Sequence, residues 1–216
     1  MKAINVAIYA LVFWLFSLTT ANAQTDYSIE TRPLSGSFTS VKTDGKVEVT
    51  IVHDSVDKVE VYAPVKIIAK VETKVENGVF TVYLKKRPAR HEVKLTLHCS
   101  GKIVNLDTKG DSEIETRCLS GKDLTLKASE GSEIDVKKVD ATGKLTIDAQ
   151  SGADVDIDVV NVSELLVNAT SGADVDLKGN AQRAELNASA GAEIDVEEMR
   201  FDNINARAIS GGWIKR

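Results

Sequence analysis

A repeat of about twenty residues constrains the fold of this chain more than any other feature of its sequence. The stretch LTLKASEGSEIDV at Leu124 returns as LTIDAQSGADVDI at Leu145. Further copies begin at Val104, Leu165, Ala184 and Ile204. The six starts are separated by 20, 21, 20, 19 and 20 residues. Such regular spacing indicates one structural unit that recurs along the chain.

Each copy predicts two short strands. Apolar residues alternate with polar ones at Leu124, Leu126 and Ala128, and again at Ile134 and Val136. This period of two is typical of half-buried strands rather than helices. Glycine-containing turns separate the two strands at residues 151–153, 171–173 and 190–192. Because glycine adopts backbone angles that strain other residues, we expect these turns to form the corners of a coil.

Stacking of such coils predicts an all-β solenoid with about 20 residues per coil. Coils about 4.8 Å apart pair their backbone edges and share one interior, which a single coil could not form. An antiparallel sandwich or barrel would also contain alternating strands. It would not require equal spacing between the copies, so the repeat favours the solenoid.

The domain boundaries follow from where the repeat is regular. We predict a short amino-terminal tail over residues 24–31 and one solenoid domain over residues 32–216. Within it, residues 32–102 form irregular first coils and a hairpin-rich cap, and residues 103–216 form the regular repeats. Asn77-Gly78 is a hairpin signal inside the cap. At the other end, Trp213, Lys215 and Arg216 could close the stack.

Residues 1–23 predict a cleaved secretory signal peptide. Lys2 precedes an apolar run from Ile4 to Leu18, and the small-residue triplet of residues 21–23 precedes Gln24. A transmembrane anchor is the alternative, but the run is shorter than the roughly 20 apolar residues that span a bilayer. We therefore expect an exported mature chain that begins at Gln24. It has no transmembrane segment and no cysteine at its start that could carry a lipid.

The charge distribution argues against nucleic acid as a partner. Residues 111–216 contain 12 Lys and Arg against 21 Asp and Glu, whereas residues 24–110 contain 14 against 11. The acidic carboxyl half repels phosphate backbones and anionic membrane surfaces, and no basic stripe with interleaved aromatic residues is present in the sequence.

The combination of signal peptide, hairpin-rich opening and Ser-Gly-Ala-Asp-Val copies resembles the head GIN domain family, grouped with autotransporter adhesins. The matching stretches are Phe38–Val52, Asn77–Val82 and the copies that begin at Ser151 and Ser171. The resemblance covers residues 32–214. It implies a right-handed β-helix in a cell-surface or secreted setting, and it supplies no catalytic residues.

Acidic residues recur on the second strand of each copy and predict two carboxylate ladders. One contains Glu113, Glu133, Asp154, Asp174 and Glu193, and the other contains Glu115, Asp135, Asp156, Asp176 and Asp195. Like charges about 4.8 Å apart repel by roughly 0.9 kcal/mol even in water, so the ladders could attract cations. Asp154, Asp156, Asp174 and Asp176 are the calcium candidates. The alternative is a solvated polar face whose repulsion is relieved by nearby Lys137, Lys138, Lys178 and Arg183.

Cys99 and Cys118 are a candidate disulfide. They lie 19 residues apart, close to one coil, so they could occupy adjacent coils within bridging distance. Export would permit oxidation. Two buried free thiols are the alternative.

Enzyme motifs are lacking in the sequence. His53, His91 and His98 show no metal-ligand spacing, and we expect no cofactor and no metal site beyond the calcium candidates. A polysaccharide-cleaving β-helix enzyme that uses Asp154, Asp156 and Asp174 is a minor alternative.

We therefore predict an exported, non-catalytic protein that presents a surface, as an adhesin or as a module that binds a protein, a glycan or an envelope polymer. A structural envelope module without a specific ligand is the alternative. We expect the exported protein to be located in the periplasm, at the outer-membrane surface or in the extracellular space. Exposed coil edges could also support self-association.

Overall fold

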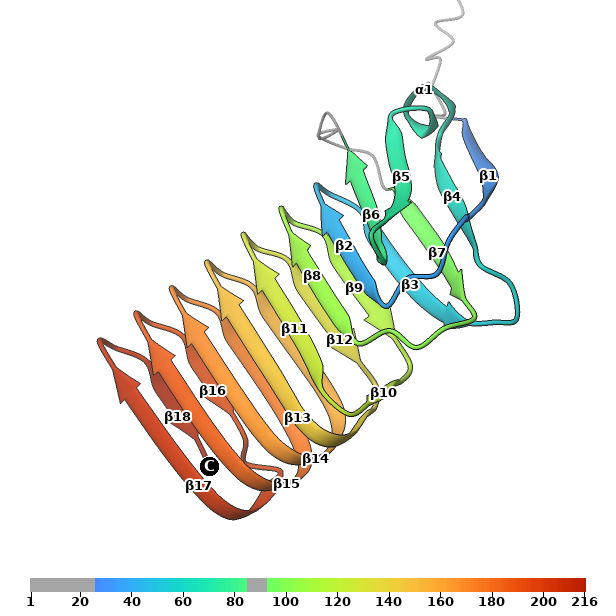
Figure 1. Cartoon of the computed structure of the whole chain (residues 1–216). Helices are drawn as coiled ribbons and strands as arrows, with labels where there is room; N and C mark the ends of the chain where they lie inside the picture. Colours follow the sequence, from blue (N-terminus) through green and yellow to red (C-terminus); the bar gives the residue numbers. More distant parts are fainter. Residues whose placement is uncertain (1–25, 85–92) are drawn as a thin grey trace, which may run out of the picture.

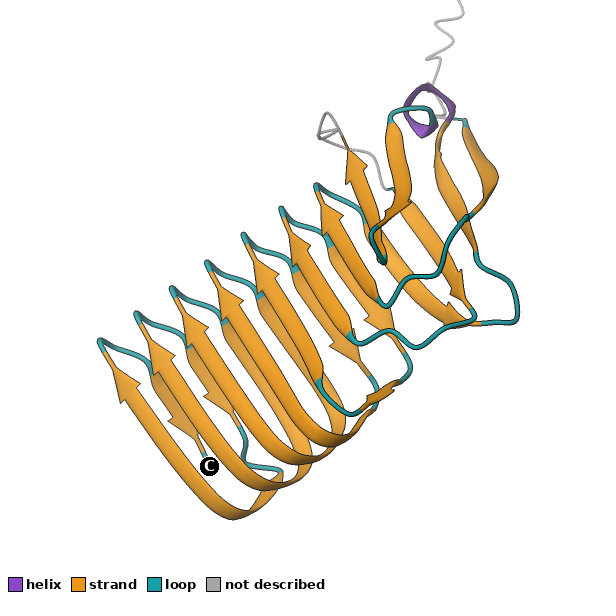
Figure 2. Cartoon of the chain, viewed as in Figure 1, coloured by secondary structure: helices purple, strands orange, loops and turns teal. Residues whose placement is uncertain are grey.

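The computed structural model describes residues 26–84 and 93–216. Strands wind into a stack of coils that forms one continuously hydrogen-bonded sheet of 18 strands (Figures 1 and 2). The one helix in the described ranges is the four-residue α1 (Val65–Ile68). The predicted all-β solenoid is confirmed. The predicted signal peptide, its cleavage site and His91 lie outside the described residues.

Two opposed faces enclose the core. The first face contains β6 (Val79–Leu84), β2 (Ser40–Asp44), β8 (Asn105–Lys109), β11 (Leu124–Ser129), the later parts of β13 (Val139–Gln150), β14 (Asp154–Thr170) and β15 (Asp174–Ser189), and β17 (Met199–Ile209). The second face contains β7 (Lys94–Cys99), β3 (Glu48–His53), β9 (Glu113–Thr116), β12 (Glu133–Val136), the early parts of β14 and β15, β16 (Glu193–Asp195) and β18 (Trp213–Lys215). The short β10 (Leu119–Gly121) pairs with the start of β13.

The sequence repeat is one coil of the structure. Leu124, Leu145, Leu165, Ala184 and Ile204 lie in register on successive coils. The spacing of 21 residues between Leu124 and Leu145 arises from a bulge in β13. Lys144 lies three residues after Ala141, but their partners on β14, Val162 and Glu164, are only two residues apart.

The 19-residue spacing has the opposite cause, a missing residue before Gly179. Val160 lies three residues after Ile157, but its partner Gly179 lies only two residues after Leu177. Both departures from twenty fall at the bend that joins the second face to the first.

The sharp corners join the first face to the second. From β8 onward each is a two-residue turn with both φ angles positive, as at Ser151 (φ 57°) and Gly152 (φ 70°), whereas the corner between β2 and β3 has a positive φ only at Gly45 (φ 100°). The hairpin between β5 (Val71–Glu76) and β6 uses the same geometry at Asn77 (φ 51°) and Gly78 (φ 78°). The predicted glycine corners and the predicted hairpin are therefore confirmed.

In the amino-terminal region the order of strands in space differs from their order in sequence. β3 lies between β7 and β9, and β2 lies between β6 and β8. β4 (Lys58–Pro64) pairs with the other edge of β7 in antiparallel orientation, and β1 (Tyr27–Pro33) pairs antiparallel with β4, so the sheet ends at β1 (Figure 1). The prediction of a tail over residues 24–31 is wrong for residues 27–31. These residues form most of β1 and pair with β4.

Inward side chains fill the space between the faces with aliphatic residues. One inward row changes character along the stack, from Thr43 and Thr108 in the first coils to Ala128 and Ala149 further on. Both threonine hydroxyls lie 2.7 Å from the Ser112 hydroxyl and 2.7 Å from each other. These buried polar groups are tolerated because each one has hydrogen-bond partners.

Candidate functional site

The outward side chains of the second face carry the two predicted acidic ladders. In stacking order the first ladder contains Glu48, Glu113, Glu133, Asp154, Asp174 and Glu193. The second contains Glu115, Asp135, Asp156, Asp176 and Asp195. Register places every carboxylate beside a carboxylate of the next coil. Glu48, which the repeat did not reveal, extends the first ladder because β3 is inserted beside β9.

The ladders carry mutual repulsion. Partial loss of solvent raises the pKa values of Glu113, Asp154, Asp156 and Asp174, and neighbouring carboxylates raise them further. For Asp154 the neighbours with the largest effect are Asp174 and Glu133, one on each side. The folded protein therefore binds protons on these groups more tightly than the unfolded chain does.

Lysines lie at both ends of the first ladder and at one end of the second. Lys94 Nζ lies 2.8 Å from Glu48 Oε2 at one end. At the other end Lys215 Nζ lies 3.4 Å from Asp195 Oδ2 and also contacts Glu193. Trp213 does not close the stack as predicted, because it occupies the outward row of Glu193 and is 62% exposed.

The four calcium candidates form two adjacent pairs, Asp154 with Asp174 and Asp156 with Asp176, across β14 and β15. Among residues 26–84 and 93–216, no three Asp, Glu, His or Cys side chains converge on a point that could hold a metal ion. The ladders are rows along a flat face rather than a cage of ligands.

Removal of one ladder charge is expected to stabilise the protein. Asp154→Asn eliminates two neighbouring repulsions and should raise the free energy of unfolding at pH 7 by roughly 0.5–1 kcal/mol after salt screening. Because the pKa of Asp154 is raised in the folded state, this gain should vanish as the pH falls below about 4, where the carboxyl is protonated in both states.

Urea unfolding at pH 7 and pH 3.5 tests this expectation. Asp202→Asn is the matched control, since Asp202 is exposed and lies outside both ladders. A loss of stability in Asp154→Asn at pH 7, or a gain that persists at pH 3.5, would contradict it.

Cys99 and Cys118 are both free thiols in the structure. The prediction that they occupy adjacent coils is wrong, because β3 is inserted between β7, which ends at Cys99, and β9, which ends two residues before Cys118. His53 of β3 fills the space between them. Its Nδ1 lies 3.7 Å from Cys99 Sγ and its Nε2 lies 3.3 Å from the carbonyl oxygen of Cys118.

The histidines that the structure describes make structural contacts. Burial raises the pKa of the Cys99 thiol to about 11, so the thiol beside His53 stays protonated at neutral pH and is a poor nucleophile. His98 Nδ1 lies 2.9 Å from Asp54 Oδ2, and His98 Nε2 lies 3.8 Å from Glu60 Oε1. These contacts connect β7 to the loop before β4 and to β4 itself.

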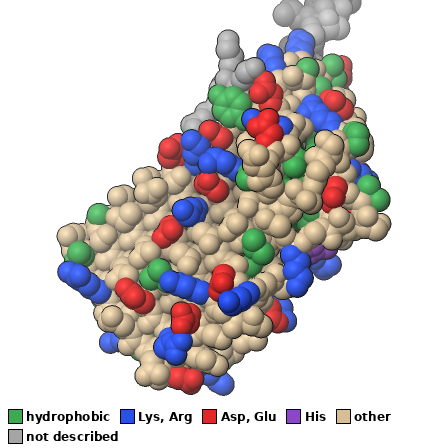
Figure 3. All heavy atoms as spheres, in the orientation of Figure 1, with side chains coloured by type: hydrophobic (Ala, Val, Ile, Leu, Met, Phe, Trp, Pro, Cys, Tyr) green, Lys and Arg blue, Asp and Glu red, His purple; other side chains and the backbone are tan. Residues whose placement is uncertain are grey.

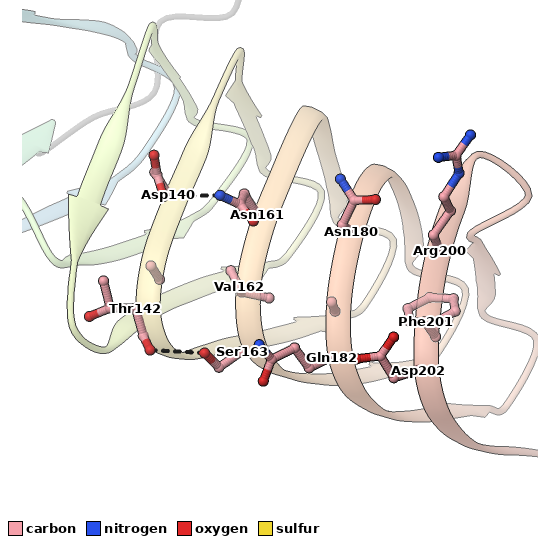
Figure 4. Close-up of a pocket in the computed structure, with 12 residues that line it drawn as sticks. Asp140, Thr142, Asn161, Val162, Ser163, Asn180, Gln182, Arg200, Phe201 and Asp202 are labelled. Carbon is pink, nitrogen blue, oxygen red and sulfur yellow. Dashed lines mark hydrogen bonds between the residues drawn. The ribbon is translucent and has the colours of Figure 1, made fainter.

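An open hollow of about 580 Å3 lies over the bend that joins the second face to the first. It crosses four coils and is lined by residues of β13, β14, β15 and β17 (Figure 4). We call it the corner groove. Its lining consists of three rows in register: Asp140, Asn161, Asn180 and Arg200; Ala141, Val162, Ala181 and Phe201; and Thr142, Ser163, Gln182 and Asp202.

A second hollow of about 410 Å3 begins one or two residues further along the same four strands. Its charged lining residues are Lys144, Glu164, Arg183 and Glu185. Arg183 Nη2 and Glu164 Oε1 form an ion pair across β14 and β15. The two hollows together give a broad, polar surface that runs along the stack.

The face visible in Figure 3 shows acidic and basic side chains interspersed. One outward row of the first face alternates in sign through Lys42, Asp107, Lys127 and Asp148. Lys42 Nζ lies 2.6 Å from Asp107 Oδ2. This face therefore lacks the continuous negative charge of the ladders.

A family model described as "Putative auto-transporter adhesin, head GIN domain" matches residues 37–143 and 125–215. The two matches overlap and together cover most of the chain. The chain belongs to this family. The resemblance found in the sequence is confirmed, and the family description suggests a surface-presenting, non-catalytic protein.

Solved structures share the fold of this head GIN domain. A "putative adhesin" from Parabacteroides merdae ATCC 43184 matches with a TM-score of 0.73 at 16% identity, over 87% of this chain and 79% of the other. One from Bacteroides fragilis NCTC 9343 matches with a TM-score of 0.68 at 12% identity, over 88% and 96%. A "putative lipid binding protein" from Parabacteroides distasonis ATCC 8503 matches with a TM-score of 0.65 at 12% identity, over 89% and 98%.

A search of curated proteins found no match to this head GIN domain. Within the part of the chain that the structure describes, no helix is long and apolar enough to cross a membrane.

The sequence did not reveal the corner groove. Its polar rows lie in the residues that precede each repeat start, outside the stretch in which the copies resemble one another most. The signal was nevertheless present, because Asn161, Asn180 and Arg200 each lie four residues before a repeat start. A row of polar side chains at one register position is the pattern that a periodic ligand would require.

Proposed function

We propose that this protein is an exported, non-catalytic binding protein that holds an extended polymer along the corner groove. The observation that carries the proposal is the groove itself, which repeats similar polar rows over four coils. Coils of a β-solenoid lie about 4.8 Å apart, so equivalent side chains recur at that interval along the stack. A ligand that contacts all four coils must be long, and a ligand with a regular repeat of its own matches the rows best.

The chemistry of the lining favours a hydrated polymer over a lipid tail. Outside its buried middle row, the groove presents amide, hydroxyl, carboxylate and guanidinium groups. Such groups lose hydrogen bonds to water when a purely apolar chain covers them, at a cost of about 1–3 kcal/mol each. One structural relative is named as lipid-binding, but the polar rows of this chain suit a different ligand.

The family description and the adhesin names of the structural relatives agree with such a role at a cell surface. Export is part of the proposal and rests on the signal-peptide pattern of residues 1–23. A binding protein of this kind needs no nucleophile and no metal.

Blocking the groove tests the proposal. The purified protein is mixed with isolated bacterial envelope polymers and with host matrix polymers, and the bound fraction is measured by co-sedimentation. Asn180 is exposed in the groove, so Asn180→Trp should fill it and weaken binding at least about tenfold, since a misfitting bulky group easily costs the corresponding 1.4 kcal/mol.

The matched control is Thr125→Trp, which adds the same side chain to an outward row of the first face, away from the groove. Equal loss in both variants would count against the groove as the site. If the unmodified protein binds none of these polymers, the proposal fails and a structural envelope module becomes the better explanation.

A further inference from the structure

The corner groove is close to neutral although it belongs to the acidic half of the chain. Asp140 and Asp202 are its acidic lining residues and Arg200 is its basic one. The adjoining hollow balances Lys144 and Arg183 against two glutamates. The acidic ladders lie on the same coils, so they repel any polyanion that approaches this end of the stack.

Most of the side chains of the groove whose hydrogen-bonding groups are unused lie on its last two coils. Asn161 Nδ2 lies 3.4 Å from Asp140 Oδ1, and the Ser163 hydroxyl donates to the carbonyl oxygen of Thr142 at 2.9 Å (Figure 4). By contrast, the side chains of the next two coils make no hydrogen bond with any residue of the described ranges: Asn180, Gln182 and Arg200.

These unused groups suit a ligand rich in hydroxyl groups. An amide side chain offers both two donor hydrogens and an acceptor oxygen, and a sugar hydroxyl likewise donates and accepts. The Arg200 guanidinium adds donors, and the Asp202 carboxylate beside it adds acceptors. Neither type of group needs a charged partner to form these bonds.

One aromatic ring borders these groups. Phe201 occupies the row that holds the buried Ala141, Val162 and Ala181 on the earlier coils, and its ring packs against the core while it stays partly exposed. Figure 4 places it between Arg200 and Asp202 on β17. An apolar ring beside a small number of oriented polar groups is the usual composition of a ligand site, and it can cover the apolar C–H face of a sugar ring.

We infer that the corner groove takes a neutral polysaccharide, with Asn180, Gln182 and Arg200 bonded to its hydroxyl groups and Phe201 against a sugar ring. This inference rests on the proposed function and narrows its ligand class.

Affinity electrophoresis against two sets of polymers tests it. Dextran, mannan, laminarin and galactan are the neutral set, and alginate, polygalacturonate and hyaluronan are the acidic set. We expect at least one neutral polymer to retard the protein, and addition of 0.3 M NaCl to leave that retardation unchanged, because salt screens charge pairs but not neutral contacts.

Two groove variants should weaken binding of that neutral polymer roughly tenfold or more: Phe201→Ala, and the double variant Asn180→Ala with Gln182→Ala. The double variant alters exposed side chains only, so it tests the site even if Phe201→Ala unfolds the terminal coil. Trp213→Ala is the matched control, since it removes an exposed aromatic ring of the same coil on the other face and should bind as the unmodified protein does.

The possible failures are distinguishable. Binding of acidic polymers alone, if Asn180→Trp abolishes it, overturns the neutral class and leaves the proposed function standing. Binding of a neutral polymer that neither groove variant weakens overturns the assignment of these residues. Binding of no polymer in either set overturns both the inference and the proposed function.

Discussion

Replacing Gly179 by alanine is expected to lower the free energy of unfolding by about 3 kcal/mol or more. Gly179 has φ +126°, a region that is strained for any residue with a side chain. A Cβ atom there would lie 2.2 Å from the carbonyl oxygen of Val160, which is backbone of the neighbouring coil and cannot rotate away. The coil would have to shift, so the melting temperature should fall by roughly 6–12 °C.

Gly172→Ala is the matched control. Gly172 also has positive φ, at +72°, but a Cβ there would meet no atom within 4 Å. Its cost should be limited to the left-handed backbone penalty of roughly 1–2 kcal/mol. Equal costs for the two glycines in urea unfolding would show that the close approach of Gly179 to Val160 is unimportant.

Replacing Phe80 by alanine is expected to cost about 3–5 kcal/mol, as for other buried aromatic residues. Phe80 is fully buried, and its ring lies 5.7 Å from that of Phe38 between centroids. Its strand β6 pairs with β2 on one side and with β5 of the cap on the other. A cavity at this position therefore weakens the junction between cap and stack.

Urea unfolding measures the total loss, and amide hydrogen exchange shows where it acts. We expect the amides of β5 and β6 to lose more protection than those of β14 and β15, since repeat stacks transmit stability mainly between neighbours. Tyr83→Ala, on the outward side of the same strand at 39% exposure, should cost less than about 1 kcal/mol. Uniform loss of protection along the whole stack would be the contrary result.

The candidate site was less predictable from sequence than the fold. The acidic ladders could be predicted because each carboxylate recurs with the same repeat that sets the coils, so sequence register and spatial register coincide at Asp154 and Asp174. The corner groove depends on how the chain bends over residues 140–144 and their equivalents. That bend includes a bulge at one coil and a missing residue at another, which no single period describes.

The prediction that Cys99 and Cys118 lie on adjacent coils was wrong for a related reason. It assumed that a separation of one repeat places Cys99 and Cys118 on adjacent coils. In the amino-terminal region β3 is inserted between their strands, because β4, α1 and β5 form the cap before the chain returns to the stack. The position of β3 between β7 and β9 involves contacts between residues far apart in sequence, such as His53 with Cys99.

The sequence by itself determined the coil. Alternation of apolar residues at Leu145 and Ile147 allows one face to be buried, and the glycine of each corner allows a turn that other residues resist, so local chemistry repeated every twenty residues leads to a solenoid. Only the tertiary structure decided how the irregular first strands interleave and where polar side chains converge over the bend. Those features depend on which strand edges pair across long sequence separations. Backbone hydrogen bonds between strands form with many different side chains, so the residues of a strand do not specify its partner.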